Sequence, residues 1–360
     1  MKYDWMIVGS GLFGSVFAHE MKKYKQTCLV IDSRNHIGGN CYTRNENGIN
    51  IQVYGPHIFH TNNKKIWDYV NQLAQFNHFT SRVKAIYKNE IFSMPINLAT
   101  MNQLWGVITP EEAISKISSQ IISCDNPKNL EEWALSKIGT DLYNTLIYGY
   151  TKKQWGRSPN TLPISIIKRL PIRFTYNDNY FEDIYQGIPI GGYTQIFEKL
   201  LEGIKVELQT EFTHDWQKYA NKLIFTGCID QFFNYKYGPL QYRGLKFVNE
   251  NMTGDYQGVA IINYTSEDIP YTRIVEHKHF EFSKNPNTTI TKEYPIQWNI
   301  GKNPYYPIND QQNNTLYGKY KEEADKLENV YFKGRLGQYK YYDMHQIIAS
   351  AIEFSKLFKI

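Results

Sequence analysis

The stretch Ile7-Val8-Gly9-Ser10-Gly11-Leu12-Phe13-Gly14 follows a short apolar run near the start of the chain and decides its fold. It predicts a strand over 4–8, a glycine turn, a helix over 15–24 and a second strand over 27–31 that ends at Asp32. Glycines at these spacings allow a tight turn, a close approach of backbone N–H groups to a pyrophosphate, and close packing of the helix on the strand. An acidic residue at position 32 can accept hydrogen bonds from an adenosine ribose. The sequence therefore predicts a dinucleotide site containing Gly9, Gly11, Gly14 and Asp32.

A second glycine pair, Gly38-Gly39, follows the predicted second strand. It resembles the motif of the glutathione-reductase-type FAD family, in which the backbone passes close to the pyrophosphate and the flavin at this point. A simple NAD domain has no need of this pair, so the pair favours FAD. The alternative is an ordinary loop that happens to contain two glycines.

Composition and charge exclude several classes of protein. Of the 360 residues, 42% are hydrophobic and 21% are charged, which is typical of a soluble globular protein with two or three domains. The net charge of +5 comes without a Lys/Arg block, so no nucleic-acid partner is expected. No apolar run reaches the roughly 18 residues of a membrane span, and no signal peptide is recognisable, so a cytoplasmic location is expected. Cysteines 28, 41, 124 and 228 form no CxxC motif, which argues against a disulfide framework and a zinc site.

Helical and strand patterns alternate along the rest of the chain. Helices are predicted over 64–76, 111–122, 129–138 (ending at Gly139), 141–150, 193–201, 316–327 and 344–358. Strands are predicted over 205–208, 222–225, 245–248, 259–264, 272–276 and 288–292, as an antiparallel sheet that could wall a substrate cleft, and over 330–332.

We therefore expect a mixed α/β (α+β) fold with a Rossmann-like FAD-binding domain of the glutathione-reductase type, an inserted small helical domain and an antiparallel-sheet substrate domain. The predicted boundaries are 1–75, 186–240 and 329–360 for the FAD domain, 95–160 for the helical insertion, and 76–94, 161–185 and 241–328 for the substrate domain.

Nine motifs, in one order along nearly the whole chain, resemble those of the bacterial UDP-galactopyranose mutase family. They are residues 7–14, 36–40, 54–61, 149–156, 167–169, 187–193, 270–277, 304–307 and 339–344. The resemblance implies a redox-neutral isomerase that carries FAD and works only when the flavin is reduced. It implies interconversion of UDP-galactopyranose and UDP-galactofuranose for cell-surface galactofuranose, in which flavin N5 attacks the anomeric carbon, UDP leaves and a flavin–sugar iminium forms.

The cofactor supplies the nucleophile in this chemistry, so the protein needs groups that bind the substrate and no nucleophile of its own. The sequence has no recognisable catalytic triad signature, as this chemistry would allow. The leaving diphosphate needs fixed positive charge, which arginine supplies best. By the resemblance, Arg169 and Arg273 are the phosphate-binding catalytic arginines and His60 is the histidine near the flavin, with Arg169 on a mobile lid near 165–175.

The resemblance also assigns binding residues by motif position. The implied substrate contacts, besides the two arginines, are Tyr150, Trp155, Tyr180, Arg243, Tyr306, Tyr341 and Asp343. The implied FAD contacts are Gly9, Gly11, Leu12, Phe13, Gly14, Asp32, Gly38, Gly39, Asn40, His57, Ile58, His60, Gly334, Arg335, Tyr341, Asp343 and Met344. NAD(P)H or another reductant and a homodimer are also implied, and no metal is expected.

Structural explanations exist for many of these residues. A single arginine is more often a solvated surface charge, Trp155 could be a core ring, and the pairs His57/His60 and His277/His279 lack an obvious third metal ligand. The chain departs from the family pattern at Pro56, Ser81, Leu146 and Ile147, which leaves UDP-N-acetylgalactosamine open as an alternative substrate. Two other functions also remain open, a flavin oxidoreductase of the amine-oxidase type and a non-catalytic nucleotide-sugar binder.

Overall fold

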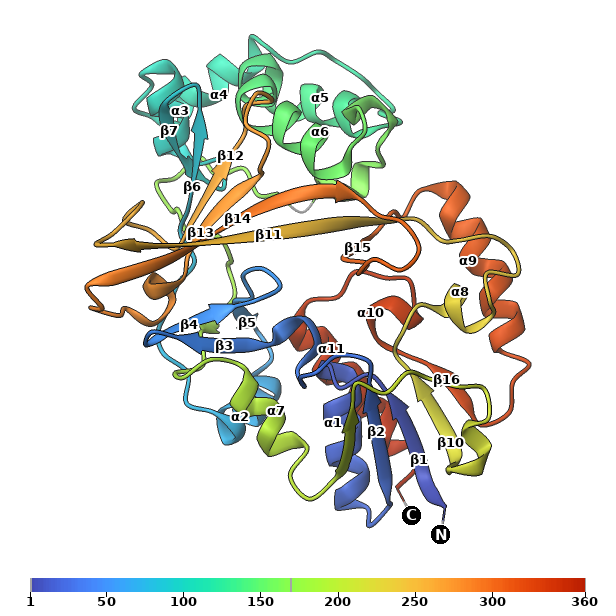
Figure 1. Cartoon of the computed structure of the whole chain (residues 1–360). Helices are drawn as coiled ribbons and strands as arrows, with labels where there is room; N and C mark the ends of the chain where they lie inside the picture. The colour runs from blue at the N-terminus through green and yellow to red at the C-terminus, as the bar shows by residue number, and fades with distance from the viewer. Residues whose placement is uncertain (1, 169, 360) are drawn as a thin grey trace. The chain divides into compact units, whose positions relative to one another are not determined.

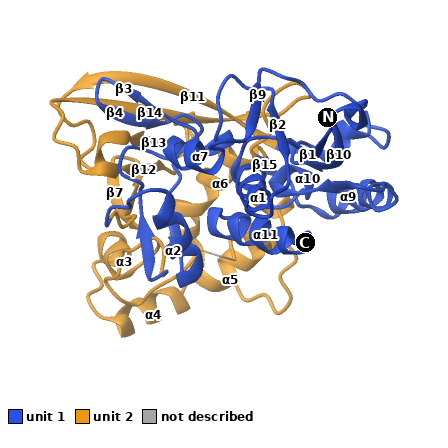
Figure 2. Ribbon diagram, turned by 90° about the horizontal axis from the view of Figure 1, so that it is seen from below, with its two compact units in different colours: residues 1–78, 183–242, 306–360 blue, residues 79–182, 243–305 orange. Residues whose placement is uncertain are grey.

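A computed structural model describes residues 2–168 and 170–359, so the predicted catalytic Arg169 lies outside the described residues. The chain divides into two compact units (Figure 2). Unit 1 contains residues 1–78, 183–242 and 306–360, and unit 2 contains residues 79–182 and 243–305. Each unit is assembled from separate stretches of the chain, as the predicted domains are, but the boundaries differ. Residues 306–328, predicted in the substrate domain, belong to unit 1.

Unit 1 is built on a parallel sheet with the strand order β16-β10-β1-β2-β9. Its strands are β1 (Tyr3–Val8), β2 (Cys28–Asp32), β9 (Lys205–Leu208), β10 (Ala220–Phe225) and β16 (Val330–Phe332). The central strands are apolar because helices and loops cover both faces of a parallel sheet. Figure 1 shows α1 (Leu12–Lys23) beside this sheet and next to α11 (Met344–Lys356).

The strands β9 and β10 correct one prediction. Both were expected in the antiparallel sheet, but β9 runs parallel to β2 and β10 runs parallel to β1. Helix α7 (Thr194–Leu200) precedes β9 and returns the chain so that β9 enters the sheet in the same direction as β2. A short strand-like run carries no information about its partner, which is why the pattern alone misassigned both strands.

Unit 1 has further elements besides this sheet. They are the hairpin of β3 (Thr43–Glu46) and β4 (Ile49–Gln52), the antiparallel pair of β5 (Phe59–Thr61) and β8 (Tyr185–Gly187), β15 (Tyr306–Pro307), and the helices α2 (Lys64–Leu73), α8 (Ile229–Phe232), α9 (Gln311–Ala324) and α10 (Gly334–Gly337).

Unit 2 contains a sheet with the strand order β11-β14-β13-β12-β6-β7. These strands are β6 (Val83–Tyr87), β7 (Glu90–Met94), β11 (Tyr242–Thr253), β12 (Ile261–Tyr264), β13 (Arg273–Glu276) and β14 (Asn287–Gln297), with the first residue of β11 at the unit boundary. All neighbours pair antiparallel except β12 and β6, which are parallel, so the predicted antiparallel sheet is a mixed one. The predicted α/β class is confirmed.

The helices of unit 2 are α3 (Leu98–Trp105), α4 (Pro110–Ser118), α5 (Leu130–Leu142), a π-helical turn over Tyr143–Tyr148 and α6 (Gly149–Trp155). They lie in the same compact unit as the sheet. The prediction that a helix stops at Gly139 is confirmed, because the backbone there leaves the helical region (φ 74°, ψ 178°) and a second helical segment begins beyond it, so that α5 is two helices joined at a kink. A Cβ at this position would lie 2.8 Å from the Gln120 Cβ, so only glycine fits. Among the described helices, none is long and apolar enough to cross a membrane.

Candidate functional site

The glycine turn of unit 1 forms a cradle of bare backbone between β1 and the N-terminus of α1. Gly9 has φ +103°, and a Cβ on it would lie 2.1 Å from the Thr226 Oγ1. A Cβ on Gly14 would lie 2.0 Å from the Gly9 carbonyl oxygen. A Cβ on Gly39 would lie 3.0 Å from the Gly11 Cα, so the two glycine loops touch. A helix N-terminus next to uncovered N–H groups is a favourable place for a pyrophosphate, so these residues fit a dinucleotide.

Asp32 lies at the carboxyl end of β2 and ties this strand to the glycine turn. Its Oδ2 accepts hydrogen bonds from the Ser10 N–H at 2.8 Å and the Ser10 Oγ–H at 2.7 Å, and its Oδ1 accepts one from the Arg34 N–H at 3.0 Å. The side chain is buried. The carboxylate therefore shapes the cradle itself, and its contact with a ribose stays a prediction.

Arg34 is a cofactor candidate that the sequence analysis missed. Its Nη2 donates to the Asn40 Oδ1 at 3.1 Å, and its guanidinium lies 4.4 Å from the centre of the Tyr54 ring. Its Nη1 is buried and has no hydrogen-bond partner among the described residues. A half-buried arginine whose Nη1 has a spare donor beside two glycine loops can hold a phosphate or a ribose. The sequence could have pointed to Arg34 through its position two residues after Asp32.

His60, on β5, belongs to a cluster with two residues that the sequence analysis did not select. Its Nδ1 lies 2.6 Å from the Asp183 Oδ2, and its ring centre lies 5.4 Å from that of His345, in the first turn of α11. Burial lowers the pKa of His345, which therefore stays neutral near pH 7. The Asp183 contact sets the orientation of the His60 ring.

Two aromatic rings and an arginine from predicted binding positions meet near the end of unit 1. The rings of Tyr306 and Tyr341 are stacked, with centres 6.5 Å apart and planes 24° apart. The Arg335 guanidinium lies 5.2 Å from the Tyr341 ring centre and 6.0 Å from that of Tyr306. These three residues present hydroxyl groups and positive charge in one place, a combination that suits a phosphate. Asp343 is the N-cap of α11, and its N–H donates to the Gln346 Oε1 at 3.0 Å.

His57, the other predicted cofactor-side histidine, is half-buried, and Cys41 is buried. Burial lowers the pKa of His57 to about 4, and its Nδ1 lies 2.9 Å from the Gly55 carbonyl oxygen. Burial raises the pKa of the Cys41 thiol to about 12, and its Sγ lies 3.8 Å from the Met344 sulfur. Both groups are therefore neutral at physiological pH, and Cys41 is a packing residue.

In unit 2, Arg273 is held by two side chains. It lies on β13 directly opposite Glu293 on β14, with 3.5 Å between Nε and Oε1. Its Nη2 donates to the Tyr150 hydroxyl at 2.9 Å. Glu293 is 1% exposed, and burial raises the pKa of its carboxyl group while Arg273 lowers it. Glu293 was missed by the sequence analysis, because only the strand register shows that it faces Arg273.

Arg243 has a different environment from the open cleft position implied by the resemblance. Its Nε donates to the Gln154 carbonyl at 2.9 Å and its Nη2 to the Lys153 carbonyl at 3.3 Å, which caps the last turn of α6. Its Nη1 donates to the Gln297 Oε1 at 3.2 Å, and burial lowers its pKa. The half-buried Trp155 lies in the same helical turn. Arg243 thus stabilises the helix that carries Tyr150 and Trp155, and its substrate contact stays a prediction.

The positions where the chain departs from the family pattern are mostly buried. Leu146 and Ile147 are buried in the π-helical turn, and Ser81 is 1% exposed. The Ser81 carbonyl accepts a hydrogen bond from the Tyr180 N–H at 2.8 Å, so it helps to place Tyr180, which is half-buried.

The histidine pair His277/His279 does not form a simple metal pair. Burial lowers the pKa of His277 to about 3, and its Nε2 lies 2.6 Å from the Thr291 Oγ1. His279 instead lies near Asp255 and Glu276, but the Lys278 ammonium already pairs with the Asp255 Oδ1 at 2.8 Å. A cation on that oxygen competes with any metal ion.

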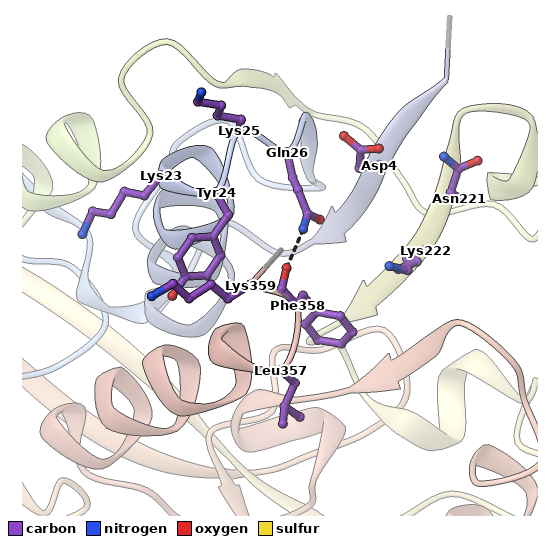
Figure 3. Close-up of a pocket in the computed structure, with 10 residues that line it drawn as sticks. All are labelled: Asp4, Lys23, Tyr24, Lys25, Gln26, Asn221, Lys222, Leu357, Phe358 and Lys359. Atoms are coloured by element: carbon purple, nitrogen blue, oxygen red, sulfur yellow. Dashed lines mark hydrogen bonds between the residues drawn. The ribbon is translucent and has the colours of Figure 1, made fainter.

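A pocket of about 1010 Å³ lies at the opposite end of the parallel sheet from the glycine turn (Figure 3). Its lining includes Asp4 at the start of β1, Lys222 near the start of β10, and Phe358, whose carbonyl accepts from the Gln26 Nε2 at 2.8 Å. Ligands of doubly wound sheets bind at the carboxyl ends of the strands, so this pocket is separate from the dinucleotide cradle.

Comparisons with known proteins agree on one family. The family described as UDP-galactopyranose mutase matches residues 145–341, and a domain described as NAD(P)-binding Rossmann-like matches residues 7–73. A probable UDP-galactopyranose mutase of Klebsiella pneumoniae is 44% identical over 97% of this chain and 92% of its own length. A dTDP-fucopyranose mutase of Escherichia coli is 40% identical over 98% of this chain and 97% of its own length.

Solved structures show the same fold at low sequence identity. A crystal structure of a reduced UDP-galactopyranose mutase has a TM-score of 0.80 at 14% identity, covering 99% of this chain and 94% of that one. A putrescine oxidase has a TM-score of 0.63 at 11% identity, covering 99% and 98%. The fold is thus shared by enzymes with different activities, and it does not separate them.

Proposed function

The chain belongs to the UDP-galactopyranose mutase family and is an isomerase, and we propose that it interconverts UDP-galactopyranose and UDP-galactofuranose with reduced FAD. The family predicted from the nine motifs is confirmed by the full-length relatives. The observation that carries the proposal is the arrangement of Arg273, which is held between Glu293 and the Tyr150 hydroxyl. A guanidinium fixed in this way is preorganised to bind a diphosphate.

The residues of unit 1 fit FAD. The bare backbone of Gly9, Gly11 and Gly39 suits the pyrophosphate, and Arg34 adds a buried donor beside it. When bound and reduced, FAD supplies an electron-rich ring nitrogen that can act as a nucleophile. The cluster of His60 and Asp183 would then set a hydrogen-bonding group of fixed orientation for the flavin ring.

The protein's share of the chemistry is the handling of the leaving group. Negative charge accumulates on the diphosphate oxygens as the sugar–phosphate bond breaks, and a fixed cation stabilises that charge more than it stabilises the bound substrate. We assign this role to Arg273 and to Arg169, with the hydroxyl groups of Tyr306 and Tyr341 as further donors. Tyr150, Trp155 and Tyr180 are assigned to the nucleotide or the sugar.

A second candidate differs in the substrate rather than in the reaction. The dTDP-fucopyranose mutase of Escherichia coli is 40% identical to this chain over nearly its whole length. A thymine nucleotide carries one methyl group that uracil lacks, and fucose lacks the 6-hydroxyl group of galactose. The same diphosphate site would serve both substrates. UDP-N-acetylgalactosamine, the alternative raised by the sequence, is a third substrate to compare.

A parallel turnover experiment tests these substrates. The FAD-loaded protein is reduced with dithionite under argon and incubated separately with UDP-galactopyranose, dTDP-fucopyranose and UDP-N-acetylgalactosamine. Chromatography should show the furanose isomer forming fastest from UDP-galactopyranose. No isomer should form when the flavin is oxidised. A faster reaction of dTDP-fucopyranose supports the second candidate. Oxygen consumption in proportion to product, or no isomer of any of the three, contradicts the proposal.

The reductant, the oligomeric state and the location are part of the proposal. We propose that NAD(P)H reduces the flavin, that the chain forms a homodimer and that it works in the cytoplasm. Anaerobic NADPH should bleach the flavin absorbance, and sedimentation equilibrium should give twice the mass of one chain. A solution that stays yellow contradicts NAD(P)H as the reductant, and the mass of a single chain contradicts the homodimer.

A further inference from the structure

The segment 173–182, called here the 173–182 loop, has no regular secondary structure but is closed by one buried arginine. The Arg173 side chain is 7% exposed, whereas most arginines of globular proteins are solvated. Its Nε donates to the Glu182 carboxylate at 3.0 Å, and its Nη1 donates to the Asn177 carbonyl at 3.2 Å and to the Asn179 carbonyl. The two ends of the loop are therefore joined through one guanidinium.

These contacts surround Tyr180 in the sequence. Asn179 lies immediately before Tyr180 and Glu182 lies two residues after it, so Arg173 holds the backbone on one side of Tyr180 and the Glu182 carboxylate on the other. Tyr180 itself is held as well, because its N–H donates to the Ser81 carbonyl at 2.8 Å. The Arg173 Nη1 bonds both loop carbonyls while its Nε bonds the Glu182 carboxylate, a set of contacts that one planar guanidinium can make at once.

We propose that Arg173 is a positioning residue, which binds no substrate itself and holds Tyr180 in place for the nucleotide. This inference rests on the proposed function, because the contact of Tyr180 with the nucleotide comes from the family resemblance. Arg173 acts through hydrogen bonds that lysine cannot reproduce, since an ammonium group lacks the rigid fork.

The same loop provides a matched control. Arg82 lies near it too, with its Nε 3.3 Å from the Asp178 Oδ1 and 3.4 Å from the Asn179 Oδ1. However, its side chain is 61% exposed, and it contacts side chains of the loop rather than the backbone. Exposed ion pairs contribute little, so Arg82→Met should leave nucleotide binding near the wild-type value.

The test is a double-mutant cycle on nucleotide affinity, measured by calorimetry with UDP and, separately, with dTDP on the FAD-loaded protein. For whichever nucleotide binds the wild type more tightly, Arg173→Met should weaken binding about tenfold, a value typical of losing one aromatic stacking contact. Tyr180→Ala should weaken it by about the same factor. The double variant should be no weaker than Tyr180→Ala alone, because Arg173 acts only through Tyr180.

Several results would overturn the inference. Wild-type affinity in Arg173→Met does so, as do multiplicative losses in the double variant, an equal loss in Arg82→Met, or a wild type that binds neither nucleotide. If Arg173→Met does not fold, Arg173→Lys replaces it and should show the same coupling to Tyr180. Nucleotide binding with this coupling but without isomer formation refutes the proposed function and supports the inference, so the two failures are distinguishable.

Discussion

Replacing Arg273 by methionine should affect turnover and stability through separate mechanisms, and the structure allows the two to be measured apart. Arg273 is the ion-pair partner of Glu293, which is 1% exposed. Removing one member of a buried pair leaves an uncompensated charge and costs about 3 kcal/mol of the free energy of unfolding, the lower end for such pairs because the Arg273 side chain is 22% exposed. Losing the cation at the diphosphate should lower turnover by about a hundredfold to a thousandfold.

The double variant Arg273→Met/Glu293→Gln separates these effects. Glutamine removes the buried charge and keeps the shape of the side chain, so stability should return to within about 1 kcal/mol of the wild type. Turnover should not recover, because the guanidinium is still absent. FAD content should stay at the wild-type level in all variants, since the cradle lies in unit 1 and Arg273 in unit 2.

The stability loss should also depend on pH. Burial raises the folded-state pKa of Glu293, so the folded state holds this proton at pH values where the unfolded state has lost it. Stability therefore falls as the pH rises above the unfolded pKa of glutamate. Without Arg273 the folded pKa is raised further, and the loss in Arg273→Met should be small at about pH 5 and large at about pH 8.

Urea unfolding followed by fluorescence gives the stabilities, and chromatography of the sugar nucleotides gives the turnover. The reasoning is refuted if Arg273→Met keeps near-normal turnover. It is also refuted if the double variant is as unstable as the single one, or if the stability loss is the same at both pH values.

Three further predictions concern unit 1 and the cysteines. Gly14→Ala should abolish FAD binding, because the new Cβ would lie 2.0 Å from a backbone oxygen, and a Gly14→Ala protein that still shows flavin absorbance contradicts the proposed cradle. As a control, Gly318→Ala on α9, where open space surrounds the new Cβ, should raise the free energy of unfolding in urea by about 0.5–1 kcal/mol. Asp183→Ala should shift the midpoint potential of the bound flavin, and Asp183→Asn, which can still accept from the His60 Nδ1–H, should shift it less. If spectroelectrochemistry gives the same potential for both variants and the wild type, Asp183 does not orient His60 at the flavin. Iodoacetamide should modify the native protein at Cys124 alone, because the other three thiols are buried with pKa values raised to about 12, and mass spectrometry of tryptic peptides would reveal any other labelled site.

The roles of individual side chains show where sequence reasoning stopped. The sequence predicted the nucleotide turn with few alternative interpretations, because the strand–turn–helix geometry itself requires glycine at positions 9 and 14. Arg273 was assigned through its motif, but its partner Glu293 depends on the register of β13 and β14. Arg243 was expected at the substrate, and its cap on α6 depends on a strand and a helix about 90 residues apart.

The sequence by itself determined the nucleotide-binding architecture, the family and the order of the functional motifs, because glycine spacing and apolar patterning act over a few residues. Tertiary structure alone decided which strands are parallel, which arginine caps a helix and which one is held by a buried carboxylate. The Tyr150 hydroxyl and the Arg273 guanidinium are 123 positions apart in the chain, and only the packing of a helix against a sheet brings them to 2.9 Å. Contacts of this kind depend on long-range pairing, and local residue patterns carry no record of them.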